Sequence, residues 1–163
     1  MQTSIKAILV SLVLTAGACG GGSDGKDLPR FVGIWAPTAG TQTSNCGGQP
    51  NTSAVSGNVT WSVGSTSDLV QASPLDSSCI IHADVDGDTA SSTTPVTCTA
   101  QSTDDYGGLV NTTVSLTAYT FALSADGETA TENFSGTILQ TDNTTGSSVT
   151  CTLTETAGSY QKQ

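Results

Sequence analysis

Residues 79–98 constrain the fold more than any other part of the chain, because alternating apolar and polar side chains flank an Asp-Gly dipeptide at residues 86–87. An Asp-Gly pair suits a two-residue turn with positive φ at both positions. The sequence therefore predicts a β-hairpin in which Val85 pairs with Asp88 and one face is buried. The buried face comprises Cys79, Ile81, Ala83, Val85, Ala90, Val96, Cys98 and Ala100.

The same alternation recurs along the chain, whereas no segment after the first 18 residues sustains the i, i+3, i+4 apolar pattern of an amphipathic helix. The pattern predicts an all-β fold: an antiparallel up-and-down meander of about eight strands that closes into a small barrel, stabilised by two disulfides. The expected strands are residues 31–46, 57–63, 69–73, 78–85, 88–100, 112–123, 128–139 and 147–156.

The interior of this barrel is expected to be narrow, because few aromatic residues and several small ones occupy the inward positions. In the sixth strand the apolar phase changes at Ala118, which predicts a β-bulge there. The outward face is rich in threonine, serine and aspartate, which excludes a membrane-embedded barrel. The inward set comprises Trp35, Val59, Trp61, Val63, Ile81, Ala83, Val85, Val96, Phe134, Ile138, Val149 and Leu153.

The first residues form an export signal rather than part of the fold. A lysine, an apolar run and Ala16-Gly17-Ala18 precede Cys19. The sequence Gly17-Ala18-Cys19 resembles the end of a bacterial lipobox, in which the cysteine is acylated; plain secretion after cleavage at the same bond is the alternative. We therefore expect a signal peptide (1–18), a lipidated glycine-rich tether (19–29) and a β-barrel domain (30–163). The expected location is the bacterial outer membrane, on its periplasmic side or at the cell surface.

Four cysteines remain when Cys19 is set aside, an even number that favours two disulfides in an exported protein. In the predicted meander the fourth and fifth strands are neighbours, as are the first and eighth. This order selects Cys79–Cys98 and Cys46–Cys151 from the three possible pairings. The hairpin register places Cys79 opposite residue 94, so we expect a bulge or loop at residues 91–95.

The charge of the chain excludes several partners. Beyond residue 18 there are 14 acidic residues against three basic ones, a net charge of −11. Nucleic acid and anionic lipid head groups are therefore poor partners. We expect a monomer that is attached to the membrane only through a lipid on Cys19 and that needs no cofactor.

The residue types that carry chemistry are sparse. Asp84-x-Asp86-x-Asp88 lacks the glycine and glutamate positions of a calcium loop, so the hairpin turn explains it, with a weak surface calcium site as the alternative. His82 is expected on an exposed strand position. Glu132 shares the face of inward apolar residues and is expected near the open rim, with a ligand-orienting role as the alternative. The candidate ligand contacts are Trp35, Trp61 and Glu132.

Two resemblances add to these patterns. Gly33-Ile34-Trp35 resembles the Gly-x-Trp motif of lipocalins, and residues 103–106 resemble their Thr-Asp-Tyr. As a whole, the chain resembles a group of Ser/Thr-rich bacterial lipoproteins with a Gly-x-Trp strand, a central hairpin bounded by cysteines and a late strand cysteine. The residues of the second match are Gly33, Trp35, Cys79, Val85, Gly87, Cys98 and Cys151. This resemblance implies a fold and an export route, and it implies no activity.

Two functions follow from these observations. The first is a non-enzymatic outer-membrane lipoprotein that acts as a structural or interaction module of the cell envelope, with an unknown protein or small-ligand partner. The alternative is a lipocalin-like carrier of a small apolar ligand. Interior volume separates the two, because a carrier needs a cavity above roughly 300 Å³.

Overall fold

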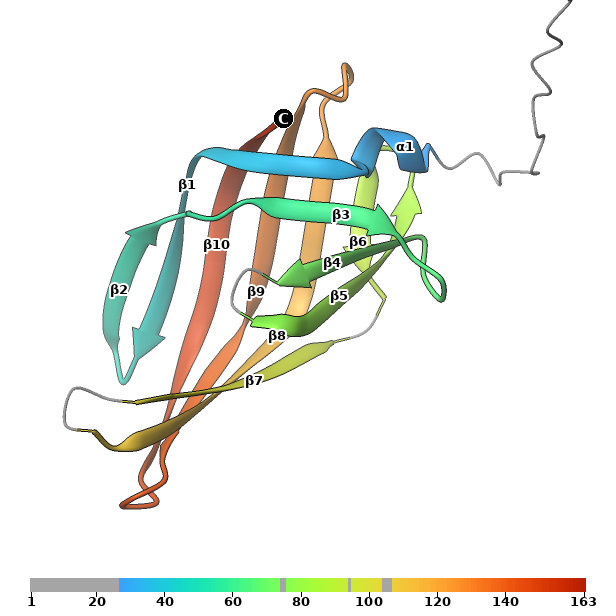
Figure 1. Cartoon of the computed structure of the whole chain (residues 1–163). Helices are drawn as coiled ribbons and strands as arrows, with labels where there is room; N and C mark the ends of the chain where they lie inside the picture. The colour runs from blue at the N-terminus through green and yellow to red at the C-terminus, as the bar shows by residue number, and fades with distance from the viewer. Residues whose placement is uncertain (1–26, 74–75, 94, 104–106) are drawn as a thin grey trace, which may run out of the picture.

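The computed structural model describes residues 27–73, 76–93, 95–103 and 107–163. The signal segment, Cys19, most of the tether and residues 104–106 of the lipocalin-like motif lie outside the described residues. Within them the chain forms one short helix and ten strands (Figure 1). These are α1 (Leu28–Phe31), β1 (Gly33–Cys46), β2 (Gln49–Ala54), β3 (Val59–Val63), β4 (Leu69–Ser73), β5 (Asp76–Asp86), β6 (Thr89–Ser92), β7 (Val96–Thr103), β8 (Leu109–Leu123), β9 (Thr129–Asp142) and β10 (Ser148–Lys162).

The strands form one antiparallel sheet, so the predicted all-β class is confirmed. Eight of them pair in the cyclic order β1-β3-β4-β5-β6-β8-β9-β10, and β10 pairs with β1 to complete the ring. The ring is not arranged evenly around an axis, and we therefore do not describe it as a barrel. The chain also leaves the predicted meander twice: among the described residues, β2 pairs only with β1 and β7 pairs only with β8.

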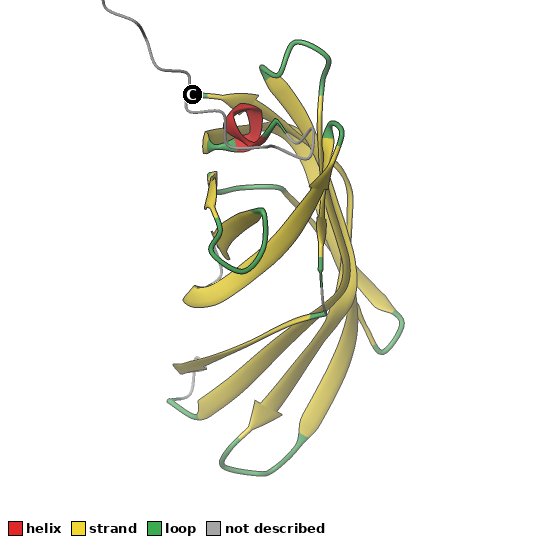
Figure 2. Ribbon diagram, turned by 90° about the vertical axis from the view of Figure 1, so that its right-hand side faces the viewer, coloured by secondary structure: helices red, strands yellow, loops and turns green. Residues whose placement is uncertain are grey.

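Because of these two departures, the long strands β1 and β8 have different neighbours at their two ends. The molecule can therefore be described as two halves. Strand β1 pairs with β3 at its start and with β2 at its end. Strand β8 pairs with β7 at its start and with β6 near its end. In Figure 1, β3, β4 and β5 cross in front of β8–β10, and Figure 2 shows the curvature of the sheet. We call the ring of β3–β6 with residues 33–37, 119–123, 129–134 and 158–162 the closed half. We call β2 and β7 with residues 41–46, 109–116, 136–142 and 148–154 the flared half.

Aromatic side chains fill the closed half. Trp35 and Phe121 meet edge to face with ring centroids 5.2 Å apart, and Trp61, Tyr119 and Tyr160 continue the same cluster. Helix α1 covers its end with Phe31, whose side chain is completely buried. Such aromatic contacts stabilise a core beyond the area that they bury. The predicted interior is thus largely confirmed here, but Val63 and Val149 are 62% and 42% exposed and do not belong to it.

Two basic side chains fasten α1 to the strands. Arg30 forms an ion pair with Asp88 and donates a 2.9 Å hydrogen bond to the carbonyl oxygen of Ser124. Lys162 Nζ donates to the carbonyl oxygen of Arg30 at 2.7 Å. Leu28 and Pro29, which were expected in the tether, belong to this helix.

The predicted β5–β6 hairpin exists, but its register was wrong by two residues. Val85 pairs with Ala90 rather than Asp88, so the turn consists of Gly87 and Asp88. The contact with Arg30 holds Asp88 in this turn, and its carbonyl oxygen accepts a 2.8 Å hydrogen bond from the backbone of Leu123. A shift of two residues leaves every side chain on its original face. The predicted buried face is therefore largely right, although Ala100 is exposed.

The two predicted disulfides, Cys46–Cys151 and Cys79–Cys98, are both present. The expected interruption after Ser91 is also present, because β6 ends at Ser92 and β7 begins at Val96. Three of the four cysteines lie on one row of paired residues that crosses five strands, and the fourth is bonded to its end. The row runs Cys46, Cys151, Ile138, Val114 and Cys98, with Cys79 attached through the disulfide.

The predicted β-bulge is found between Leu116 and Ala118 of β8. It brings Leu116 and Tyr119 to the inner face although they are three residues apart. Gly136 pairs with Leu116 beside this bulge, and a Cβ atom at Gly136 would come within 2.1 Å of the carbonyl oxygen of Ser115. Only glycine allows β8 and β9 to approach this closely.

Candidate ligand-binding cavity

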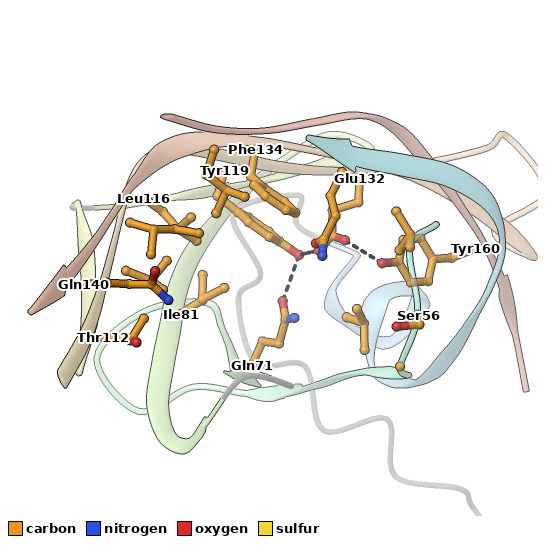
Figure 3. Close-up of a pocket in the computed structure, with 17 residues that line it drawn as sticks. Ser56, Gln71, Ile81, Thr112, Leu116, Tyr119, Glu132, Phe134, Gln140 and Tyr160 are labelled. Atoms are coloured by element: carbon orange, nitrogen blue, oxygen red, sulfur yellow. Dashed lines mark hydrogen bonds between the residues drawn. The ribbon is translucent and has the colours of Figure 1, made fainter. Parts of the chain in front are cut away.

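A cavity of about 460 Å³ lies inside the ring (Figure 3). Its floor is made by side chains of the closed half that are buried, whereas Ser56, Gly57 and Gln140 are exposed and mark its mouth. The narrow interior expected from the sequence was therefore wrong. The lining comprises Gln42, Val55, Ser56, Gly57, Val59, Gln71, Ile81, Thr112, Val114, Leu116, Tyr119, Glu132, Phe134, Ile138, Gln140, Leu153 and Tyr160.

The cavity arises because the bulky residues are unevenly distributed along the strands. Five aromatic rings pack together in the closed half, whereas the inner face of the flared half carries aliphatic residues such as Val114, Ile138 and Leu153. Gly136 contributes no side chain between them. The ring is wide enough for aromatic residues, so smaller side chains leave space unfilled.

A carboxylate lies on the floor of the cavity. Glu132 is 4% exposed, and its Oε2 accepts a 2.6 Å hydrogen bond from the hydroxyl of Tyr160. The hydroxyl of Tyr119 contacts Glu132 Oε1 and also lies 2.8 Å from Gln71 Oε1. These four residues come from β4, β8, β9 and β10, so the cluster exists only when the ring is complete. A buried carboxylate is costly unless it is hydrogen-bonded, and the two phenols supply those bonds.

The position of Glu132 corrects the expectation that it lies near the open rim. It pairs with Phe121 on one side and with Gly158 on the other, both in the closed half. The alternative of a ligand-orienting position is consistent with this placement.

The two predicted tryptophan contacts do not line the cavity. Trp35 lies in the aromatic core, where its Nε1 donates a 2.8 Å hydrogen bond to the carbonyl oxygen of Phe31. Trp61 is 1% exposed, and its Nε1 has no hydrogen-bond partner among the residues described.

Three polar residues of the floor were missed by sequence reasoning: Gln71, Tyr119 and Tyr160. Gln71 alternates with Leu69, which would have placed it on the inner face. Tyr160 lay beyond the expected end of the last strand at residue 156, whereas β10 continues to Lys162.

His82 is half-buried rather than exposed, and its Nδ1 lies 3.2 Å from the hydroxyl oxygen of Ser67. That hydroxyl donates its single proton to the carbonyl oxygen of Leu69 at 2.9 Å. The described part of the chain brings no three histidine, cysteine or acidic residues together in a metal-binding group.

Comparison of the chain with protein-family models, curated proteins and solved structures finds no match. Among the described residues, no helix has the length and apolar character to cross a membrane.

Proposed function

We propose that this protein is a non-enzymatic binding protein of the cell envelope that holds a small, largely apolar molecule in its cavity. The observation that carries the proposal is the cavity itself, at about 460 Å³. Ligand sites are typically concave, of roughly 300–1,000 Å³, with apolar walls and a few polar groups that fix the orientation of the ligand. The cavity has this composition, with aliphatic walls and the Glu132 cluster on the floor.

This proposal reverses the order of the two functions that the sequence suggested. A purely structural module has no need of an interior cavity, because each unfilled space removes packing contacts that stabilise a core. A carrier uses that space. The proposal does not depend on the lipocalin resemblance, since residues 104–106 lie outside the described residues.

The location in the envelope is supported by the export signal and by the two disulfides, which persist in oxidising compartments. A lipid on Cys19 would anchor the chain to the outer membrane, and the tether would reach the domain at α1 of the closed half. The intact mass of the protein from the membrane fraction tests this: acyl chains on Cys19 are expected. An unmodified Cys19 at the N-terminus of soluble protein would instead indicate simple secretion.

Displacement of a fluorescent apolar probe tests the binding function. We expect the folded, oxidised protein to bind such a probe at micromolar concentration. Ile138→Trp places a large ring inside the cavity and should weaken probe binding at least tenfold. Leu139→Trp is the matched control, because Leu139 is the next residue of β9, is 40% exposed and does not line the cavity.

Two results would contradict the proposal. The first is a folded protein that binds no apolar probe. The second is an Ile138→Trp variant that is folded, by circular dichroism, and binds the probe as tightly as the Leu139→Trp variant does. Either result would return the structural or interaction module to first place.

A further inference from the structure

We propose that the ligand is an amphipathic amine, whose apolar body fills the flared half of the cavity and whose positively charged nitrogen lies against Glu132. This inference rests on the proposed binding function and specifies the class of ligand. It is carried by three observations about the floor of the cavity: its charge, its hydrogen-bonding groups and its aromatic rings.

The charge of the lining favours a cation. The described residues that line the cavity include one carboxylate, that of Glu132, and no lysine, arginine or histidine. The two basic side chains within the described part of the chain, Arg30 and Lys162, bind at α1 and the neighbouring turns. A ligand carboxylate on this floor would face a buried negative charge with no positive lining group, and such a juxtaposition opposes binding. A cationic ligand places opposite charges together in a poorly solvated site, where their attraction is stronger than in water.

The hydrogen-bonding groups favour a donor. The hydroxyl of Tyr119 lies within reach of Glu132 Oε1 and, at 2.8 Å, of Gln71 Oε1, but a phenol has one proton. Both Oε1 atoms are hydrogen-bond acceptors that face the cavity floor. An ammonium group carries up to three N–H donors and no acceptor. Placed between Gln71 and Glu132, it would donate to both of these acceptors.

The aromatic rings favour a positive nitrogen over a neutral one. Figure 3 shows Glu132 with Tyr119 and Phe134 on one side and Tyr160 on the other. All three rings line the cavity, and Tyr119 and Phe134 are directly paired across β8 and β9. The face of an aromatic ring attracts a cation electrostatically, and the attraction grows when water is excluded. A carboxylate among aromatic rings is thus suited to an ammonium group.

The remaining walls suit an apolar body. Ile81, Val114, Leu116, Ile138 and Leu153 surround the space between the floor and the mouth. They offer no charged group, so the recognition of the nitrogen is confined to the floor. The ligand is expected to enter nitrogen first, since the carboxylate lies at the buried end.

Titration calorimetry with three ten-carbon probes tests the inference: decylamine, which is protonated at neutral pH, decanol and decanoate. The two ionic probes are used below their micellar concentrations, and decanol below its solubility limit. Decylamine should bind at least tenfold more tightly than decanol, and decanoate should bind most weakly. Glu132→Gln should reduce the affinity for decylamine at least tenfold and change that for decanol by less than about threefold. Decanol binding by this variant also shows that its cavity remains intact.

The matched control is Asp84→Asn, which changes the net charge by the same unit on an exposed residue of β5 outside the cavity lining. Asp84→Asn should leave the affinity for decylamine unchanged. If it lowers this affinity as much as Glu132→Gln does, the effect comes from the overall charge of the chain and the inference is overturned. The rank order of the probes on the unaltered protein needs no variant. If decanol or decanoate binds as tightly as decylamine, the inference fails while the binding function stands. If none of the three binds, the binding function fails as well.

Discussion

The hydrogen bond between Tyr160 and Glu132 should make a measurable contribution to stability, because it is a bond to a carboxylate on the cavity floor. The Tyr160 hydroxyl lies 2.6 Å from Oε2 in a site where Tyr160 is 2% and Glu132 4% exposed. Tyr160→Phe removes only the hydroxyl and keeps the ring, whose centroid lies 5.8 Å from that of Phe121. Hydrogen bonds to charged groups contribute about 1.5–3 kcal/mol, so the variant should lose about 2 kcal/mol.

Urea unfolding of the oxidised protein measures this loss. For a domain of this size the urea dependence of the unfolding free energy is about 2 kcal/mol per molar, so the midpoint should fall by about 1 M. Thr43→Val is the matched control, because it deletes a hydroxyl whose 3.0 Å contact, with Thr52, is exposed. Its effect should stay within about 0.5 kcal/mol.

A double-mutant cycle with Glu132→Gln separates the bond from other effects of the substitution. If the charge of the carboxylate strengthens the bond, Tyr160→Phe should cost less in the Glu132→Gln background, by about 1 kcal/mol. The physical reasoning is refuted if Tyr160→Phe alone costs less than about 0.5 kcal/mol, or if the two substitutions are additive.

Three further predictions concern the sheet and one of its turns. Gly136→Ala should destabilise the protein by more than about 3 kcal/mol in urea unfolding, since its Cβ would lie 2.1 Å from a carbonyl oxygen of β8; an unchanged midpoint would contradict the close approach. Replacing Cys46 and Cys151 by alanine opens a bridge that spans 105 residues, for which chain entropy predicts a loss of about 4–5 kcal/mol; a loss under about 1 kcal/mol would contradict it. The Thr145 side chain and nearby backbone N–H groups hold the pKa of Asp142 below its ordinary value of 3.8. The Asp142 carboxylate therefore stabilises the fold above pH 3.8, and this stabilisation is lost as the pH falls through the lower pKa of the folded state. Thr145→Val removes the hydrogen-bonding hydroxyl and should raise the pKa of Asp142 in an NMR titration. An unchanged pKa would contradict the assigned cause.

Local patterns were sufficient for much of the fold. Alternation is a property of a single strand, so the faces of β5 were predicted although the hairpin register was not. The change of apolar phase at Ala118 is equally local, and the bulge was found there. The disulfides followed from strand neighbours, Cys79–Cys98 from the hairpin and Cys46–Cys151 from closure of the ring, and neither inference required the details of register.

The remaining features depend on contacts between distant residues. The β5–β6 register is associated with the ion pair of Asp88 with Arg30, 58 residues away in sequence. Strand β2 is exposed along its whole length, so it carries no alternation by which it could be recognised. Whether Glu132 lies at the buried floor or at the rim depends on the register of β9 with β8 and β10. Alternation within β9 does not determine that register.

The cavity was missed for the same reason. Alternation shows which residues point inward, but it does not show at which level along the axis of the ring each one lies. Whether a given level is filled by side chains or left as a cavity depends on which residues meet there. The aromatic residues that contact one another, among them Trp35, Trp61 and Phe121, come from strands far apart in sequence and meet at one level. The number of large and small inward residues, taken for the ring as a whole, predicts a uniformly narrow interior instead.

The separation into two halves also explains where the disulfides lie. In the closed half, packed rings and α1 hold the strands together. In the flared half, the walls of the cavity lack packing partners on their inner side, and dispersion contacts across the ring are lost. The row of paired residues that contains Cys46, Cys151 and Cys98 also contains Ile138 and Val114, which line the cavity. The Cys46–Cys151 disulfide joins β1 to β10 within the flared half, and Cys79–Cys98 ties β7 of the flared half to β5 of the closed half. Both disulfides thus fasten strands of the flared half, and they allow the fold to keep a cavity without losing the strands that enclose it.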